Sequence, residues 1–220
     1  MLTTNDGGTT MSAMVEGDST HTSRTRLLEA GKTLFAQHGY EQTATATIAR
    51  EAGTSESQLV RYYGGKAGLL GAIFNESWLS MNQQVQTRIA AASNAREALV
   101  GVLDTMIESF TADPDAAFLF VFEGRRVRGA EITVSKGFID FQDLLRVVVN
   151  RGHRDGTLEP GYNDEALSVA LMGAAEALLR ERLMARRANR PDPFDDAEIR
   201  AVFLALLSGL SQKKVVRVSG

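Results

Sequence analysis

Apolar residues at helical spacing, along a chain almost free of proline, restrict the fold more than any other feature. The 220 residues include four prolines, at positions 114, 160, 191 and 193. Between them, leucine, alanine and valine recur every three or four residues, and sustained strand-like alternation is missing. The sequence therefore predicts an all-α fold, with helices over residues 24–38, 45–52, 55–62, 66–90, 95–111, 115–128, 131–153, 163–188 and 195–212.

Composition limits the classes of protein to which the chain can belong. Its 44% hydrophobic and 23% charged residues are ordinary for a soluble globular protein. The absence of cysteine excludes disulfides and thiol nucleophiles, and a cytoplasmic location is expected. Residues 1–22 lack the basic start and apolar run of a signal peptide, and we interpret them as a disordered arm. The most apolar later run, residues 201–207, is far shorter than the ~20 residues of a membrane span, so no membrane partner is expected.

A small residue, a glycine and a leucine are spaced as in two short helices that cross steeply. Ala49 is small enough to lie where the helices approach most closely, and Gly53 can adopt the positive φ of the turn. Leu59 can serve as the apolar anchor of the second helix. Ser55 suits the cap at the start of that second helix. Taken alone, this spacing fits a helix-turn-helix and an ordinary helical corner equally well.

The flanking residues favour the first of these two interpretations. From Arg26 to Leu70 the chain reads RLLEAGKTLFAQHGYEQTATATIAREAGTSESQLVRYYGGKAGLL. This stretch resembles, without a gap, the DNA-binding region of TetR-family transcriptional regulators. The residues that carry the resemblance are Leu34, Phe35, Gly39, Tyr40, Ile48, Ala49, Ala52, Gly53, Ser55, Leu59, Tyr62, Tyr63, Lys66, Leu69 and Leu70.

Four positions depart from the family pattern. Val60 stands where the family usually has tyrosine, and Ala67 stands where glutamate usually follows the lysine. Ala44 and Thr45 replace the usual hydroxyl residue and a larger aliphatic residue. These departures bear on individual backbone contacts and on local packing, and they leave the helix-turn-helix geometry unchanged.

The resemblance implies a domain order and a function. It implies a three-helix, helix-turn-helix DNA-binding domain over residues 23–68, a helical-bundle domain for ligand binding and dimerisation over residues 69–214, and a tail over residues 215–220. The implied function is a sequence-specific regulator, a repressor that leaves a palindromic operator when a small ligand binds the second domain. Double-stranded operator DNA and an unidentified small-molecule effector are the expected partners.

The second short helix of the motif carries the residues best placed to read bases. Because Leu59 is committed inward, its polar neighbours Gln58 and Arg61 are available to the major groove. Glutamine can pair with adenine, arginine with guanine or a phosphate, and a glutamate can accept from cytosine or repel the DNA backbone. The resemblance adds phosphate contacts by Tyr62, Lys66, Thr45 and Thr47. The expected DNA-binding set is Thr45, Thr47, Ser55, Glu56, Ser57, Gln58, Arg61, Tyr62 and Lys66.

Charge alone does not distinguish DNA contact from ordinary surface polarity. The net charge is −3, and residues 23–66 hold six basic against four acidic residues, the one block with a basic excess. The polar residues of the second helix also fit a solvated face. In the same way, Tyr62 also fits a packing aromatic and Lys66 a free surface charge.

Two C-terminal segments are apolar over wide faces and suggest a dimer interface. They read SVALMGAAEALLRERL from Ser168 and IRAVFLALLSGL from Ile199, and Gly173, Ala174 and Ala205 permit close approach of helices. The resemblance implies that these last two helices pair with those of a second copy as a four-helix bundle. The alternative is a hairpin buried within one subunit.

Phenylalanine is concentrated in a short part of the C-terminal region. Six of the ten phenylalanines, at positions 110, 118, 120, 122, 138 and 141, lie within 32 residues, which is enough to line a ligand cavity between helices. The alternative is that they form an ordinary core and that nearby acids form surface ion pairs. The candidate ligand-binding residues are Trp78, Met81, Phe110, Phe118, Phe122, Glu123, Phe138, Phe141 and Glu176.

Neither of two rival functions has a motif of its own. The three histidines lack metal-binding helical spacing, the serines lack an elbow motif, and YYGGKAG does not match a phosphate loop. The chain is therefore not expected to be an enzyme, and no catalytic residue, metal or cofactor is predicted. The other rival is a helical protein-interaction adaptor that reuses the helix-turn-helix scaffold, which salt-dependent binding to duplex DNA distinguishes from a regulator.

Overall fold

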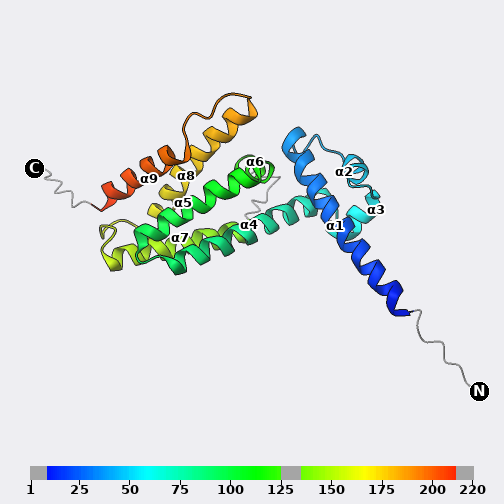
Figure 1. The fold of residues 1–220 in the computed structure, drawn as a ribbon, viewed down its shortest axis with the longest axis horizontal. Coiled ribbons are helices and arrows are strands. Elements are labelled where there is room, and N and C mark those ends of the chain that lie inside the picture. Colours follow the sequence, from blue (N-terminus) through cyan, green and yellow to red (C-terminus); the bar gives the residue numbers. More distant parts are fainter. Residues whose placement is uncertain (1–8, 125–134, 212–220) are drawn as a thin grey trace, which may run out of the picture. The chain divides into compact units, whose positions relative to one another are not determined.

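The computed structural model describes residues 9–124 and 135–211 of the chain, and every regular element within these ranges is a helix (Figure 1). The all-α prediction is confirmed. Contacts divide the chain into an N-terminal unit, Met1–Ile73, and a C-terminal unit, Phe74–Gly220. The helices are α1 (Thr9–His38), α2 (Thr45–Glu51), α3 (Glu56–Tyr63), α4 (Lys66–Ala91), α5 (Ala95–Ala112), α6 (Pro114–Phe122), α7 (Lys136–Asp155), α8 (Asp164–Arg187) and α9 (Asp196–Leu210).

The helix bounds differ most from the expected ones in α1, α6 and α7. α1 begins at Thr9 rather than at residue 24, so residues 9–22, expected in a disordered arm, belong to a helix that no proline interrupts. α6 ends at Phe122 rather than at residue 128, because the backbone N–H groups of Glu123 and Gly124 both turn back to the carbonyl of Leu119. Residues 1–8, 125–134 and 212–220, which include the expected end of the second domain and the tail 215–220, lie outside the described residues.

The third difference concerns both ends of α7. The expected helix spanned residues 131–153, whereas α7 begins at Lys136, after the N-cap Ser135, and continues to Asp155 before the C-cap Gly156, whose φ is 78°. Gly152 is buried inside the helix, and a Cβ there would lie 2.6 Å from the side chain of Leu158. The glycine thus serves close packing instead of chain reversal.

Three helices and the start of α4 form the N-terminal unit. α1 packs against α2 and α3, and Leu27, Phe35, Ile48 and Leu59 are fully buried between them. Leu69 at the start of α4 is also fully buried, and Gly31 of α1 lets its side chain approach, because a Cβ at Gly31 would lie 2.6 Å from it. This core holds α2 and α3 in a fixed relation.

α5 is the central helix of the C-terminal unit. It packs against α6, α7, α8 and α9, and its buried face includes Leu99, Leu103 and Ile107. α5 and α6 begin at capping side chains, Asn94 and Asp113, each of which accepts a backbone N–H from the first helical turn. None of the described helices combines the length and apolar character needed to cross a membrane.

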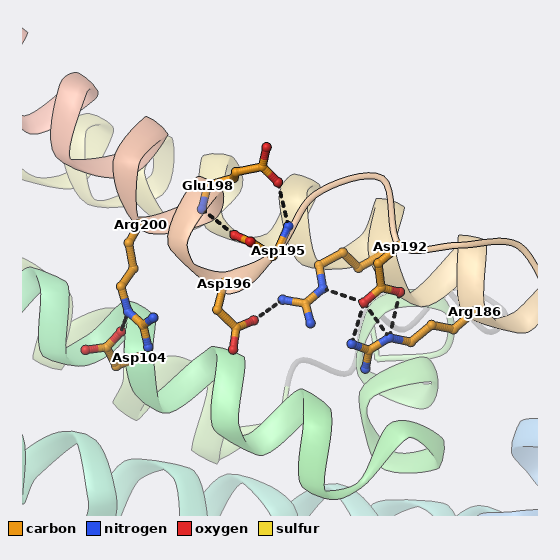
Figure 2. Close-up of polar contacts among 8 residues, drawn as sticks. Asp104, Arg186, Asp192, Asp195, Asp196, Glu198 and Arg200 are labelled. Atoms are coloured by element: carbon orange, nitrogen blue, oxygen red, sulfur yellow. Dashed lines mark hydrogen bonds and ion pairs between the residues drawn. The ribbon is translucent and has the colours of Figure 1, made fainter.

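Ion pairs fix the connection between α8 and α9 (Figure 2). Arg186 donates to both carboxylate oxygens of Asp192, at 2.8 Å from Nε to Oδ1 and 2.6 Å from Nη2 to Oδ2. The nearly buried guanidinium of Arg182 pairs with Asp192 and Asp196. Arg200 of α9 pairs with Asp104 of α5 at 2.5 Å. These pairs attach α9 to its neighbours at both α8 and α5.

Candidate nucleic-acid interface and ligand cavity

The turn between α2 and α3 has the predicted helix-turn-helix geometry. Gly53 has a φ of 61°, in the left-handed region that glycine adopts without strain. Ala49 and Leu59 are buried, as expected for the closest approach and the apolar anchor. Ser55 caps α3, where its side chain accepts the backbone N–H of Gln58. The predicted crossing of α2 and α3 around Gly53 is therefore present.

α3 separates a buried face from a polar face. Leu59 and Tyr63 are buried, and the Tyr63 hydroxyl donates to the carbonyl of Arg24 at 2.7 Å, which attaches α3 to α1. The expected base-reading residues Gln58 and Arg61 are half-buried and exposed, respectively. Glu56 and Ser57, which also belong to the expected set, are exposed. The fold therefore leaves these side chains accessible from one side of α3.

Several of these polar side chains are held by one another. Thr45 at the start of α2 donates its hydroxyl to Glu56 Oε2 at 2.6 Å. Arg61 Nη2 lies 2.8 Å from the Tyr62 hydroxyl, and the guanidinium lies 4.8 Å from the centre of the Tyr62 ring. Ser55 and Ser57 share a hydrogen bond of 2.9 Å between their hydroxyls. The polar surface is therefore partly preorganised.

Lys66 has a contact that sequence reasoning missed. Its ammonium group donates to the carbonyl oxygens of Tyr40, Glu41 and Thr43, at 3.0, 3.4 and 3.1 Å. It also lies 4.5 Å from the centre of the Tyr40 ring. The partners are 23 to 26 residues away along the chain, so no local pattern reveals the contact. Lys66 is thus a side chain that stabilises the turn between α1 and α2, rather than a free surface charge.

The start of α2 lacks the cap that the family pattern would supply. Ala44 occupies the N-cap position with extended backbone, and no side chain caps the helix there. The carbonyl of Ala44 accepts from the backbone of Thr47 and Ile48, so the helix still begins at this point. Thr45 and Thr47, expected near phosphates, are both half-buried in the first turn.

An apolar cavity lies among α4, α5, α6, α7 and α8 within the C-terminal unit. Six of the nine candidate ligand-binding residues line it: Trp78, Met81, Phe110, Phe138, Phe141 and Glu176. Trp78 is the hub of its aromatic wall, with ring centres 4.5 Å from Phe120 and 5.4 Å from Phe141. The cavity volume is about 40 Å³, room for a few water molecules. A much larger ligand needs more space than this volume.

Three of the candidate residues do not line this cavity. The rings of Phe118 and Phe122 pack on each other, with centres 4.6 Å apart, and the guanidinium of Arg187 lies 3.7 Å from the Phe118 ring centre. Glu123 is buried next to Phe122 at the end of α6. Their spacing places Phe118 and Phe122 on one side of α6, away from the side that carries Phe120 and Val121.

Seven lining residues were not among the nine candidates, although one of them, Phe120, belongs to the phenylalanine-rich stretch noted in the sequence. They are Phe74, Met106, Phe120, Val121, Gly124, Ser135 and Met172. Phe74, Met106 and Met172 each precede a candidate residue by four positions, so the helical repeat places them on the same face as Trp78, Phe110 and Glu176. Extending each candidate by one helical turn would have found these three.

Exposed apolar side chains lie along α8 and α9. They include Val169 and Met184 on α8 and Val202 and Leu206 on α9. Gly173 of α8 has no heavy atom within 4 Å of an added Cβ, and Ala205 of α9 is exposed. The two helices also pack on each other within the chain. Both therefore contribute to the core and retain an apolar outer surface.

Comparisons with known proteins agree with this arrangement. Residues 27–73 match the family profile described as bacterial regulatory proteins, tetR family. The fatty acid metabolism regulator protein of Bacillus subtilis (strain 168) is 21% identical over 142 residues, which span 63% of this chain and 72% of that protein. The HTH-type transcriptional repressor KstR2 of Rhodococcus jostii (strain RHA1) is 24% identical over 144 residues, which span 64% and 71%.

A solved structure shares the fold over most of the chain. It is the transcriptional regulator FadR of Bacillus subtilis in complex with stearoyl-CoA, with a TM-score of 0.73 and 18% identity. The match covers 86% of this chain and 97% of that structure. The N-terminal helix-turn-helix and the C-terminal helical bundle are thus a known combination.

Proposed function

Because the chain belongs to the tetR family of bacterial regulatory proteins, we propose that it is a repressor that binds a palindromic operator as a homodimer. In this proposal, a small ligand in the C-terminal cavity releases the DNA. The observation that carries the proposal is the joint placement of a buried Leu59, a left-handed Gly53 and an exposed polar face on α3. This arrangement suits a helix that enters the major groove of DNA.

The polar residues of α2 and α3 divide by their chemistry into two roles. Gln58 and Arg61 are the residues we assign to base edges, since an amide pairs with adenine and a guanidinium with guanine. We assign phosphate contacts to the hydroxyls of Thr45, Thr47, Ser55 and Tyr62 and to the ammonium group of Lys66. Ser57 and Glu56 lie on the same accessible surface and complete the interface.

Dimerisation follows from what a single short helix can read. α3 has eight residues and covers only a few base pairs, and useful selectivity normally comes from two copies related by a two-fold axis. The exposed Val169, Met184, Val202 and Leu206 support the assignment of α8 and α9 as the interface. Burying these side chains between two copies removes apolar surface from water at about 25 cal/mol per Å².

The cavity indicates an effector with an apolar body. Six aromatic rings and three methionines line it, and Glu176 is its one described carboxylate. Since a relative of the same fold was solved with stearoyl-CoA, we propose that a long-chain acyl group is among the ligands that suit this cavity. Such a group needs more space than about 40 Å³ and must push helices apart to enter.

Wall displacement supplies the switch in this proposal. A ligand shifts an equilibrium only if it binds one conformation more tightly than the other. A cavity of about 40 Å³ meets this condition if its walls must separate for the ligand to fit, because the ligand then binds only the form with separated walls. The opened form would hold the DNA-binding units of a dimer at a spacing that no longer fits successive major grooves. We infer that the regulator acts in the cytoplasm, where chromosomal DNA lies.

The proposal is tested by selecting bound sequences from a random duplex pool with the full-length protein and repeating the selection with Arg61→Ala. We expect an enriched inverted repeat for the native chain and weaker or altered enrichment for the variant. Failure of the native chain to enrich any sequence would contradict the proposal and favour the adaptor function. Thermal unfolding of both proteins controls for loss of fold.

A further inference from the structure

Val60 is the one large apolar side chain that α3 exposes, and the DNA-binding assignments above leave it unused. Its side chain is 56% exposed. Exposed apolar surface is unfavourable in water, so burying this side chain against a partner would be favourable. It follows the fully buried Leu59 directly and precedes the exposed Arg61, so it lies at the edge of the accessible face of α3. Glu56 is four residues earlier and therefore on the same side of the helix.

The surroundings of Val60 are those of a reading surface rather than a protein core. Thr45 holds the Glu56 carboxylate by a hydrogen bond of 2.6 Å, and Tyr62 holds Arg61 by one of 2.8 Å. The backbone of Val60 is also fixed, because its carbonyl accepts from the N–H of Gly64 at 2.8 Å. The backbone that carries Val60 is thus fixed, and the polar residues Glu56 and Arg61 of the same helix are anchored by hydrogen bonds.

We propose that Val60 is a specificity-determining residue that reads the 5-methyl group of a thymine in the operator. This inference rests on the proposed function. In the major groove, thymine is the base that presents a methyl group, and apolar side chains recognise it by contact. A branched side chain with no hydrogen-bonding atom gains nothing from phosphates or from polar base edges. Its burial against a methyl group removes apolar surface of both partners from water.

The test removes the methyl group from the DNA and the side chain from the protein separately. In the operator obtained by selection, each thymine is replaced in turn by deoxyuridine in both half-sites, and affinities are measured by fluorescence anisotropy. The proteins are the native chain, Val60→Ala and Val147→Ala. Val147 is a matched control because it is a valine exposed to 60% on α7, in the C-terminal unit. Alanine is well tolerated in an exposed helix, so Val60→Ala is expected to fold.

We expect one thymine position at which replacement by deoxyuridine lowers the operator affinity of the native chain and of Val147→Ala about fourfold per half-site. This is the effect expected when one methyl-sized group is no longer buried. At that position Val60→Ala binds thymine and deoxyuridine operators equally. The inference is overturned if, at every position, replacing thymine by deoxyuridine changes the operator affinities of the native chain and of Val60→Ala by the same factor. Because this test starts from an enriched operator, its failure is distinct from failure of the proposed function, in which no operator is obtained.

Discussion

The ammonium group of Lys66 donates a hydrogen bond of 3.0 Å to the carbonyl of Tyr40 and lies 4.5 Å from the centre of its ring. Two further carbonyls, of Glu41 and Thr43, complete its set of acceptors. This side chain therefore joins the start of α4 to the turn that positions α2. Because an ammonium group has three N–H donors, a hydrogen bond from Lys66 to a phosphate would replace one of these bonds.

Lys66→Met is expected to lower the free energy of unfolding by about 1–2 kcal/mol, because the hydrogen bonds from the charged ammonium group are lost and the three carbonyl groups lose their donor. Chemical denaturation measures the change. Lys136→Met is the control, since Lys136 is a highly exposed lysine whose ion pair with Asp140 contributes little. Equal stability of the Lys66 variant and the native chain would contradict the structural role. If the Lys66 variant also shows a slope of log affinity against log salt that is smaller by the equivalent of about one phosphate contact, this would add evidence for phosphate contact.

Gln58→Ala is expected to change the base preference at one position of each half-site while leaving overall stability unchanged. The reason is that a glutamine amide recognises adenine through two hydrogen bonds, a contact worth about 1–3 kcal/mol of discrimination. Selection from a random pool, compared with the native chain, gives the readout. Gln86→Ala, an exposed glutamine of α4 in the C-terminal unit, is the matched control. An identical selected sequence for Gln58→Ala and the native chain would remove Gln58 from base reading.

Ala44→Ser is expected to stabilise the N-terminal unit by about 1 kcal/mol, because the uncapped start of α2 gains a side-chain acceptor for its free N–H groups. Ala46→Ser, an exposed position inside α2, changes the same residue type without creating a cap and is expected to be neutral or slightly destabilising. Thermal unfolding compares the three proteins. A stabilisation shared by both variants would show that capping is not the cause.

Local sequence predicted the existence of every described helix, together with the helix-turn-helix geometry. Ala49, Gly53 and Leu59 act within one short segment, so their spacing contains the relevant geometry. The contacts of Lys66 were missed because they join residues more than twenty positions apart. Phe118 and Phe122 were assigned to the cavity because composition does not reveal which side of α6 faces it. Helix orientation depends on tertiary packing, which a single sequence does not display.

Gly137→Ala is expected to destabilise the C-terminal unit by about 1–3 kcal/mol through overpacking. A Cβ at this position would lie 2.2 Å from the Cβ of Trp78, which cannot move without the backbone of α4. Trp78 is the single tryptophan of the chain, so its fluorescence emission reports the disturbance of the cavity wall directly. Gly71→Ala is the control, because an added Cβ there meets no heavy atom within 4 Å. Unchanged emission and stability in Gly137→Ala would contradict the packing described.

Stability is expected to fall in acid partly through Asp192. The hydrogen bonds from Arg186 hold the pKa of the Asp192 carboxyl below its ordinary value of 3.8, against the opposing effect of burial. A lowered pKa stabilises the folded state above the unfolded pKa, and this contribution is lost as pH falls through the folded pKa. Asp192→Asn and Arg186→Met should each reduce the dependence of the unfolding free energy on pH below about 4. A dependence as steep as that of the native chain would contradict the assignment.

The most direct test of the central claim is an equilibrium titration of the full-length protein against the selected inverted repeat, a single half-site and a random duplex at two salt concentrations. We predict two protomers per inverted repeat, much weaker binding to the half-site and to the random duplex, and an affinity that falls steeply with salt. Equal affinity for all three duplexes, or binding that does not depend on salt, would contradict the account of a dimeric operator-binding regulator.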